Sequence, residues 1–184
     1  VMTKPAASDN AEQIEYWNGE FGRHWVKIQD ELDAMFQPIE LGGIERAGLE
    51  AGERVIDIGC GGGSSSLAIA QAVGPDGHVL GVDVSEPMLA LARSRAKKVA
   101  NVTFALADAS TYKFVPEAAD LVFSRFGVMF FADPMAAFAN IRTALKADGR
   151  LCLVVWRPVK ENPWVMQSLM IAAKHVTMPA PLGP

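Results

Sequence analysis

The sequence predicts an α/β protein built on a doubly wound, mostly parallel sheet. From residue 54 onward, short apolar runs of strand length alternate with segments whose apolar residues recur at helical spacing. Such alternation produces parallel strands with helices on both faces of the sheet. An acidic residue ends each of the first three runs: Asp57, Asp83 and Asp108. Because the carboxyl ends of parallel strands share one edge, where α/β proteins bind ligands, these acids are expected at a binding site.

The clearest local pattern lies in residues 54–70, RVIDIGCGGGSSSLAIA. Its apolar beginning predicts a strand, and its last residues restart the apolar pattern at helical spacing. Between them, Gly59, Gly61, Gly62 and Gly63 predict a tight turn that a ligand can approach closely. The serines at 64–66 are expected to cap the helix, and the positive end of its dipole would face that ligand.

The region before this motif is predicted to be helical. Apolar residues spaced by three or four run from Ile14 to Met35, as in an amphipathic helix that Asn18-Gly19 can divide in two. Pro38 is expected to start a further helix that ends near Gly48. The apolar stripe has two interpretations. It is either a packed cover for the core or a roof over a ligand site formed by three aromatic residues, Tyr16, Trp17 and Trp25.

Strands and helices are predicted to alternate through the rest of the chain. The expected strands cover 78–82, 102–107, 119–124 and 150–156, and the expected helices cover 85–98, 133–146 and 162–176. Ser85 and Asp133 occupy the N-cap positions of two of these helices, each with a proline in the following turn. Residues 1–10 and the tail after 176 are expected to lie outside regular structure.

Composition narrows the classes of partner. The chain has 184 residues, half of them hydrophobic, and a net charge of −4. This is enough for one domain with a sizeable core, and the charge predicts neither a nucleic-acid partner nor a membrane surface. Cys60 and Cys152 form no disulfide framework and no metal-binding spacing, so we predict no metal and a reducing, cytoplasmic location. The first residues lack a signal pattern, and no apolar run is long enough for a bilayer.

Two nucleoside cofactors compete for this arrangement of acids and glycines. A dinucleotide site prefers G-x-G-x-x-G and places a pyrophosphate at the helix N-terminus. Here the third glycine is displaced, and Asp57 would lie beside the negative pyrophosphate. A carboxylate at this position suits a cationic amine instead. S-adenosylmethionine offers an ammonium group, a sulfonium, a ribose and an adenine without any phosphate, and the acid after the second strand suits the ribose hydroxyls.

Four segments carry a resemblance to a known family. These are DIGCGGG at 57–63, GVDVS at 81–85, ADA at 107–109 and DLVFSRFGVMFFADP at 120–134. Together they resemble the class I S-adenosylmethionine-dependent methyltransferases, especially the small-molecule branch (methyltransferase type 11/25-like), over roughly residues 12–164. The resemblance implies a Rossmann-like sheet and three parts: an N-terminal helical lid in 1–50, a cofactor-binding core in 51–160, and a helix with a truncated tail in 161–184.

The resemblance also implies roles for individual residues. Asp57 would lie near the ammonium group of the cofactor, and Asp83 would hold the ribose hydroxyls. Asp108 would accept a hydrogen bond from the adenine amino group. The other implied cofactor contacts come from the glycine loop, the second strand and its helix, the third and fourth strands, and the lid: Gly59, Cys60, Gly61, Gly63, Val84, Met88, Ala109, Ser124, Arg125, Trp17 and Trp25.

No residue stands out as a catalytic base. Methyl transfer is an in-line displacement in which the cofactor supplies the reactivity and the protein supplies alignment and a dry pocket. His24 and Arg125 are the candidates, the first as a base and the second as a group that orients an anionic acceptor. The acceptor is expected to be a small molecule. The alternatives are a NAD(P)-dependent oxidoreductase and a non-catalytic cofactor-binding or regulatory module of the same fold.

The chain departs from the family pattern at its C-terminal end. The family sheet has seven strands, whereas this sequence supplies five. Without the others, the run at 151–156 would form an exposed apolar edge, which favours aggregation. We therefore expect that the C-terminal strands are missing from this chain and that it is part of a longer protein.

Overall fold

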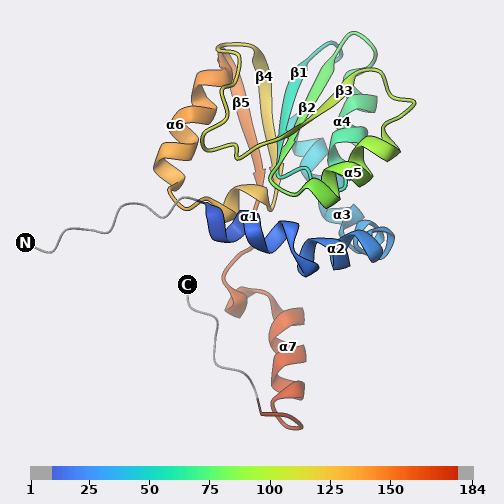
Figure 1. Cartoon of the computed structure of the whole chain (residues 1–184), viewed down its shortest axis with the longest axis vertical. Helices are drawn as coiled ribbons and strands as arrows, with labels where there is room; N and C mark the ends of the chain where they lie inside the picture. The colour runs from blue at the N-terminus through green and yellow to red at the C-terminus, as the bar shows by residue number, and fades with distance from the viewer. Residues whose placement is uncertain (1–9, 178–184) are drawn as a thin grey trace, which may run out of the picture. The chain divides into compact units, whose positions relative to one another are not determined.

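A computed structural model describes residues 10–177, in which the chain divides into one unit up to Val154 and a second from Val155. The first unit contains a five-stranded sheet in the order β3-β2-β1-β4-β5, and all neighbouring strands are parallel. Figure 1 shows this sheet between its helices. The predicted α/β class and parallel sheet are therefore confirmed. The strands are β1 (Arg54–Ile58), β2 (His78–Asp83), β3 (Val102–Leu106), β4 (Ala119–Arg125) and β5 (Leu145–Val154).

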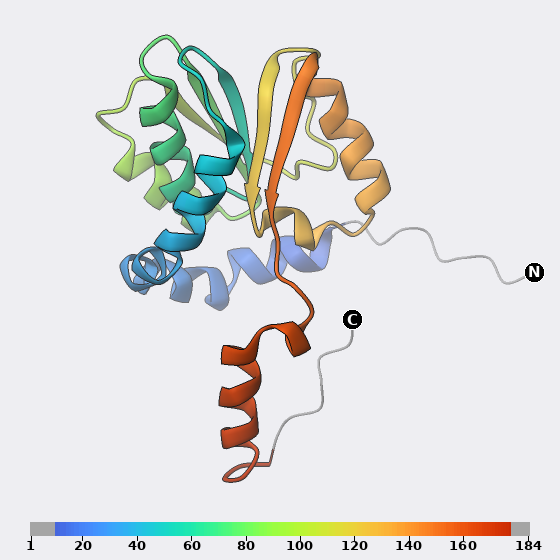
Figure 2. The ribbon, with the colours of Figure 1, turned by 180° about the vertical axis from the view of Figure 1, so that it is seen from behind.

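The helices cover both faces of the sheet. Figures 1 and 2 show α6 (Pro134–Ala144) on the face opposite α4 (Ser64–Val73) and α5 (Glu86–Arg95). Alternate residues of β1 enter two separate cores: Val55 packs with α4, whereas Ile56 packs in the other core, which contains residues of α6. This two-residue period explains why the side chain of Asp57 lies on the α4 face, where the helix after the glycine loop begins.

Three N-terminal helices occupy the segment that we predict as a lid and call the lid: α1 (Ala11–Asn18), α2 (Glu20–Lys27) and α3 (Gln29–Ala47). Gly19 separates α1 from α2, which confirms the predicted break. In Figure 1, α1 and α2 run across the carboxyl ends of the strands. The lid therefore lies at the edge of the sheet where the acids of the first three strands end.

The prediction that Pro38 starts a helix is wrong. Pro38 lies inside α3, a single helix of 19 residues that ends at the left-handed Gly48. Tertiary contacts explain why the helix continues through a residue that removes one hydrogen bond, because α3 buries Gln29 and Glu40 on either side of the proline and Gly43 and Ala47 beyond it.

The prediction for the fifth strand and the helix before it is also wrong in its boundaries. The helix ends at Ala144 rather than near 146, and β5 already begins at Leu145 and ends at Val154. Leu145 pairs with Ala119 and Arg150 with Leu121, so the register shifts between them and accommodates the polar residues that suggested a helix end. In the described chain β5 is an edge strand, and Leu151 is 48% exposed.

The remaining boundaries differ by a few residues. The helix predicted over 85–98 ends at Arg95, and the strand predicted over 102–107 ends at Leu106. The short 3-10 helix η1 (Gly127–Phe130) was not predicted. The second unit contains the 3-10 helix η2 (Val159–Glu161) and α7 (Pro163–Ala172), shorter than the predicted 162–176. The predictions for residues 1–9 and 178–184 lie outside the described residues. None of the helices in residues 10–177 combines the length and apolar character that crossing a bilayer requires.

Candidate functional site

The glycine loop between β1 and α4 makes the predicted sharp turn. Gly59, Gly61 and Gly63 have φ angles of 68°, 52° and 82°, in the region that other residues rarely adopt. At Gly59 an added Cβ would collide with the Cα of Gly127, and at Gly63 it would lie 2.9 Å from the Ala92 Cβ. These two glycines therefore let neighbouring backbone and helix pack against the loop.

The open side of the loop lies at Gly61 and Gly62. A Cβ on Gly61 would meet only the terminal methyl of Met88, and one on Gly62 would meet the side chain of Gln29 from α3. Met88 is buried against the loop, as its predicted place beside a cofactor requires. Since both neighbours are ends of flexible side chains rather than backbone, this part of the loop is where a ligand can approach.

Asp57 is completely buried behind the loop. Its Oδ2 accepts hydrogen bonds from the hydroxyls of Ser65 at 2.7 Å and Ser66 at 2.6 Å. Burial raises the pKa of Asp57 to about 6, although the two serines and the charge of Arg125 oppose this shift. The predicted serine cap of α4 is wrong, because Gly63 takes the N-cap position. The hydroxyls of these two serines donate to the carboxylate instead, and a hydrogen bond to a charged acceptor is stronger than one between neutral groups.

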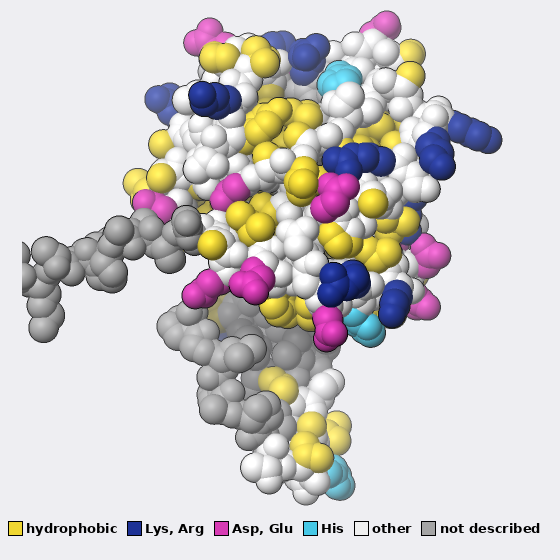
Figure 3. All heavy atoms as spheres, viewed as in Figure 1, with side chains coloured by type: hydrophobic (Ala, Val, Ile, Leu, Met, Phe, Trp, Pro, Cys, Tyr) yellow, Lys and Arg dark blue, Asp and Glu magenta, His cyan; other side chains and the backbone are white. Residues whose placement is uncertain are grey.

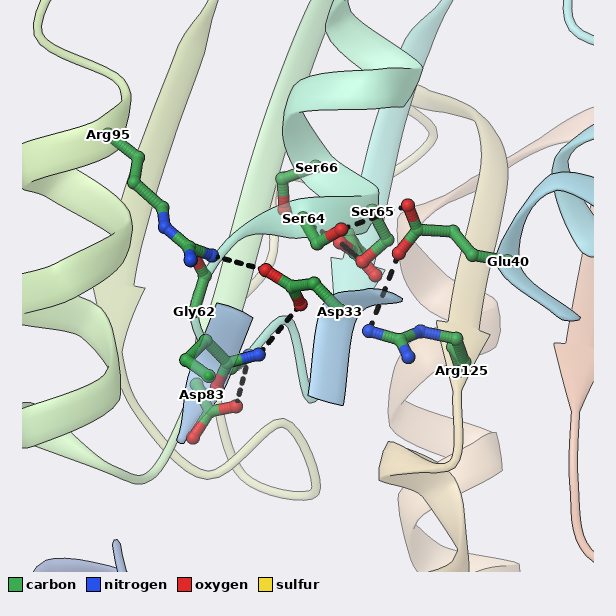
Figure 4. A network of polar contacts seen from close by, with 12 residues as sticks. Asp33, Glu40, Gly62, Ser64, Ser65, Ser66, Asp83, Arg95 and Arg125 are labelled. Carbon is green, nitrogen blue, oxygen red and sulfur yellow. Dashed lines mark hydrogen bonds and ion pairs between the residues drawn. The ribbon is translucent and has the colours of Figure 1, made fainter. Parts of the chain in front are cut away.

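A buried ion pair joins the lid to the end of β4. Figure 4 shows Glu40 of α3 and Arg125 pointing toward each other beside the serines of α4. The Glu40 carboxylate lies 3.4 Å from the Arg125 guanidinium and accepts a hydrogen bond of 2.9 Å from Ser64. Burial raises the pKa of Glu40, while Arg125 and Ser64 oppose the shift. The guanidinium also lies over the rings of Phe36 and Phe126, at 5.8 and 6.0 Å from their centroids.

Three buried polar atoms around this loop have no hydrogen-bond partner among the described residues: Asp57 Oδ1, Gln29 Oε1 and Arg125 Nε. Gln29 donates its amide to Asp33, which leaves its oxygen unpaired. Buried polar atoms are nearly always paired in folded proteins, because leaving one unpaired costs about 1–3 kcal/mol. A ligand with both a donor and an acceptor group would satisfy these two unpaired acceptors and one unpaired donor beside the glycine loop.

Asp83 closes the other end of the loop. Its two carboxylate oxygens accept the backbone N–H groups of Gly61 and Ser85, both at 2.8 Å. Burial raises its pKa, and these backbone hydrogen bonds oppose the shift. Each oxygen keeps a second lone pair, so the carboxylate, locked in position, can still accept two hydroxyl groups. In Figure 4 it lies below Gly62, on the side of the view away from the Glu40–Arg125 pair.

The lid is attached to the loop after β2. Ser85 does not cap α5 with its hydroxyl, which donates instead to the carbonyl of Trp17 at 2.8 Å. Asn18 accepts the backbone N–H of Glu86 and donates to the carbonyl of Val84. Ser85 is the N-cap residue of α5, as predicted, but Asn18 of the lid supplies the capping acceptor from 68 residues away.

The third acid, Asp108, closes a turn after β3. Its carboxylate accepts the N–H of Ser110 at 2.8 Å, and Ala109 beside it is buried. Asn140 of α6 donates to the carbonyls of Ala109 and Tyr112 and so fixes this turn from the other face of the sheet. One of the Asp108 oxygens is engaged in this turn, so the structure leaves its predicted contact with adenine as a prediction.

Ser124 and Cys60 are structural neighbours of the loop. The Ser124 hydroxyl donates to the carbonyl of Ile58 at 2.8 Å and accepts the N–H of Val128, which ties β4 to β1 and to η1. The thiol of Cys60 is buried beside Gly81, and burial raises its pKa. Among the described residues, no group of histidine, cysteine and acidic side chains could hold a metal ion.

The predicted aromatic roof exists as a cluster of rings. Trp17 makes edge contacts with Trp25 and Phe21, at 5.4 and 5.3 Å, and Phe130 of η1 adds a fourth ring 5.8 Å from Trp17. Tyr16 is stacked on Phe21 and is 49% exposed. His24 is exposed on α2, and no hydrogen bond of its side chain to the loop is present in the described chain.

Several residues of the site were not predicted. These are Gln29, Glu40 and Arg95, which all lie at or beside the loop. Arg95 of α5 forms ion pairs with Asp30 and Asp33 of α3 at 2.7 Å. The sequence pattern of their helices indicates only helical spacing. Their contacts could not be predicted, because the partners lie 24 or more residues away in the sequence. No sequence signal distinguishes Gln29 and Glu40, since α3 is otherwise mostly exposed or half-buried and buries only Gly43 and Ala47 beside them.

Comparison with known proteins places this geometry in a family. A family model described as a methyltransferase domain matches residues 49–177, more than half of the chain. The chain belongs to this methyltransferase domain family. The resemblance of the four segments to methyltransferases is therefore confirmed, together with the Rossmann-like fold that it implied.

Individual relatives share the family. Aklanonic acid methyltransferase DauC from Streptomyces sp. (strain C5) is 36% identical over 130 residues, which are 65% of this chain and 59% of that protein. Phosphoethanolamine N-methyltransferase 1 from Triticum aestivum is 32% identical over 111 residues, 60% of this chain and 22% of that protein. This chain thus spans less than two thirds of the length of either relative.

Solved structures agree with the fold. Phosphoethanolamine N-methyltransferase 2 from Haemonchus contortus, in complex with S-adenosyl-L-methionine, superposes with a TM-score of 0.69 and 25% identity, over 94% of this chain and 45% of that chain. A putative S-adenosylmethionine-dependent methyltransferase from Methanococcus maripaludis has a TM-score of 0.65 and 25% identity, over 94% of this chain and 75% of that chain.

Proposed function

We propose that this chain binds S-adenosylmethionine at its glycine loop and directs the methyl group to a small-molecule acceptor. The observation that carries the proposal is the set of three unpaired buried atoms around the loop. An ammonium group can donate to Asp57 Oδ1 and Gln29 Oε1, and a carboxylate can accept from Arg125 Nε. The amino-acid end of the cofactor carries both groups, so it fits the residues present.

Charge supports a cationic ligand over a pyrophosphate. Asp57, Glu40 and Asp83 surround the loop, whereas Arg125 pairs with Glu40 and Arg95 pairs with Asp30 and Asp33. When the acids are ionised, the local charge is negative, which attracts the sulfonium and ammonium groups and repels phosphate. This balance opposes the dinucleotide alternative.

Each part of the site has a separate task in this proposal. Asp83 would hold the ribose through its two remaining lone pairs, and Met88 and Val84 would pack beside the adenine. The cofactor supplies the electrophilic methyl group, and the lid excludes water from it. Neither catalytic candidate from the sequence is positioned as a base at the loop, because His24 is exposed on α2 and Arg125 is held by Glu40. The chain would therefore act by alignment, with the acceptor supplying the nucleophile.

The small-molecule acceptor is supported by the relatives. Their names record methylation of aklanonic acid and of phosphoethanolamine, two acceptors with different charge. The relatives therefore support methyl transfer to a small molecule and do not indicate which one.

Isothermal titration calorimetry with S-adenosylhomocysteine and with NAD⁺ tests the cofactor. We expect S-adenosylhomocysteine to bind with a 1:1 stoichiometry and NAD⁺ to give no heat of binding. Binding of NAD⁺ in preference to S-adenosylhomocysteine would establish the oxidoreductase alternative. Binding of S-adenosylhomocysteine together with no methyl transfer to acceptors of several classes would identify a non-catalytic module.

A further inference from the structure

A chain of polar contacts runs from α5 through α3 to the glycine loop. The Arg95 guanidinium donates through Nη1 to Asp33 Oδ2 at 2.7 Å, and Figure 4 shows these two side chains pointing toward each other. Asp33 Oδ1 accepts the amide nitrogen of Gln29 at 2.8 Å. The Gln29 amide lies on Gly62, and the Gly62 carbonyl accepts a second hydrogen bond from Arg95 Nη1, at 3.3 Å. Arg95 and Gln29 therefore hold Gly62 from the two ends of this chain.

The chemistry of Asp33 decides which atom of the Gln29 amide faces the loop. A carboxylate paired with a guanidinium can only accept hydrogen bonds, so the amide must turn its nitrogen toward Asp33. The amide oxygen is then left 3.3 Å from the position that a Cβ on Gly62 would occupy. Gln29 is 6% exposed, and its Oε1 has no hydrogen-bond partner among the described residues. The amide therefore presents its acceptor, rather than its donor, to a ligand at Gly62.

Arg95 has two acidic partners, and only Asp33 connects it to Gln29. Asp30 and Asp33 each lie 2.7 Å from the guanidinium, but the Asp30 side chain is 94% exposed, whereas those of Asp33 and Arg95 are each 23% exposed. Figure 3 shows acidic and basic side chains interspersed on the face of the molecule that carries α5. Exposed ion pairs contribute little, because water screens them. Asp30 is therefore a natural control for Asp33.

We infer that Arg95 and Asp33 are positioning residues that turn the Gln29 amide oxygen toward the ligand and so select an ammonium group at Gly62. The inference rests on the proposed function, because a methyl donor bound at the loop is what brings an ammonium group to Gly62. Gln29 contacts the ligand, whereas Arg95 and Asp33 act through Gln29. An amide turned the other way would present its nitrogen, and two donors facing each other would exclude the ammonium group.

Asp33→Asn is the variant that should turn the Gln29 amide around. An asparagine side chain has one acceptor oxygen and one donor nitrogen, and the charged guanidinium of Arg95 takes the oxygen. The donor nitrogen then faces Gln29, whose amide must offer its oxygen there and present its nitrogen to the loop. The variant keeps the shape of the side chain and inverts the polarity that Gln29 presents to the ligand.

Calorimetry tests the inference with two analogues of S-adenosylhomocysteine, each lacking one end group. The amino analogue, 5′-(3-aminopropylthio)-5′-deoxyadenosine, keeps the ammonium group, and the carboxy analogue, 5′-(3-carboxypropylthio)-5′-deoxyadenosine, keeps the carboxylate. We expect Asp33→Asn to weaken binding of the amino analogue about tenfold, as the loss of a hydrogen bond to a charged group predicts, and to leave the carboxy analogue within twofold. Asp30→Asn, the matched control on the same guanidinium, should change the affinity for each analogue less than twofold.

A double variant shows whether Asp33 acts through Gln29. Gln29→Met keeps the length of the side chain but has no amide, so Asp33→Asn added to it has nothing left to turn. We expect the double variant to bind the amino analogue within twofold of Gln29→Met alone. A further loss as large as the one in the parent background would overturn the inference, because Asp33 would then act on the ligand by another route.

The two proposals fail in different ways. If the parent protein does not bind S-adenosylhomocysteine, the proposed function is wrong and this inference falls with it. If S-adenosylhomocysteine binds but the amino analogue does not, or if Asp33→Asn weakens both analogues equally or neither, the inference is wrong and the proposed function stands. Arg95→Met, which leaves Asp33 without its ion pair, serves if Asp33→Asn does not fold. It should also weaken the amino analogue more than the carboxy analogue, and equal losses would again overturn the inference.

Discussion

The two sides of the glycine loop differ in chemistry. On the α3 side, the contacts are buried and polar: Glu40 pairs with Arg125, and Gln29 lies on Gly62 with an unpaired oxygen. On the α1–η1 side, the contacts are aromatic and partly exposed, as at Trp17 and Phe130. The two sides of the loop therefore predict different chemical parts of a ligand. Unpaired buried polar atoms predict a charged ligand group, and exposed rings predict an apolar one.

The largest expected effect comes from breaking the junction that both sides share. Gly59→Ala should lower the free energy of unfolding by about 4 kcal/mol, because it adds a Cβ that collides with Gly127 in a left-handed backbone. Gly48→Ala is the matched control, since Gly48 is left-handed, with φ 57° and ψ 51°, and has nothing within 4 Å of the added Cβ. It should cost only about 1 kcal/mol. Equal losses in urea denaturation would show that backbone conformation, rather than the Gly59–Gly127 contact, dominates.

The next largest effect is expected from Arg125→Met, on the polar side of the loop. The substitution leaves the buried Glu40 without its partner and should lower the free energy of unfolding by about 3 kcal/mol. Arg125→Met combined with Glu40→Gln should recover a large part of this loss. Arg93→Met, which removes the exposed partner of Glu86, should cost less than about 1 kcal/mol. A double variant no more stable than Arg125→Met alone would argue against the pair.

The pH dependence of stability reports on Asp57. Its pKa is about 6 in the folded protein, whereas the ordinary pKa of an aspartate is 3.8. Between these values the unfolded chain releases a proton that the folded protein keeps, so this residue destabilises the fold as pH rises from about 4 to 6. Relative to Asp57→Asn, the parent protein should lose up to about 3 kcal/mol across this range. Parallel stability curves for the two proteins, measured by urea denaturation between pH 3.5 and 7.5, would contradict the raised pKa.

Substitution of Asp83 tests the part of the site that is expected to bind the ribose. Asp83→Ala should weaken binding of S-adenosylhomocysteine by about 2 kcal/mol, because hydrogen bonds to a charged group contribute about 1.5–3 kcal/mol. Asp76→Ala, at an exposed turn residue, is the control and should leave the affinity unchanged. Calorimetry on both variants decides the point, and an unaltered affinity for Asp83→Ala would remove this residue from the site.

The smallest effect is expected outside both sides of the loop, at Met135 of α6. Met135→Lys should change the free energy of unfolding by less than about 0.5 kcal/mol, because Met135 is 83% exposed. Thermal denaturation measures it. A loss above about 2 kcal/mol would mean that Met135 belongs to the core.

The sequence predicted the centre of the molecule better than its lid. The alternation of residues in β1 placed Asp57, and the glycines placed the turn, because both follow from local periodicity and backbone conformation. The contacts of Glu40 and Gln29 depend on partners distant in sequence, which local patterns do not record. The predicted serine cap is wrong because Gly63 takes the N-cap position, and two of the serines donate to Asp57 of the preceding strand from inside the helix.

The most direct test of the central claim compares S-adenosylhomocysteine with 5′-methylthioadenosine, which lacks the amino-acid end. If the unpaired atoms of Asp57, Gln29 and Arg125 receive an ammonium and a carboxylate, calorimetry should show S-adenosylhomocysteine binding at least tenfold more tightly. Arg125→Met should reduce this difference. Equal affinities of the parent protein for the two nucleosides would contradict the account.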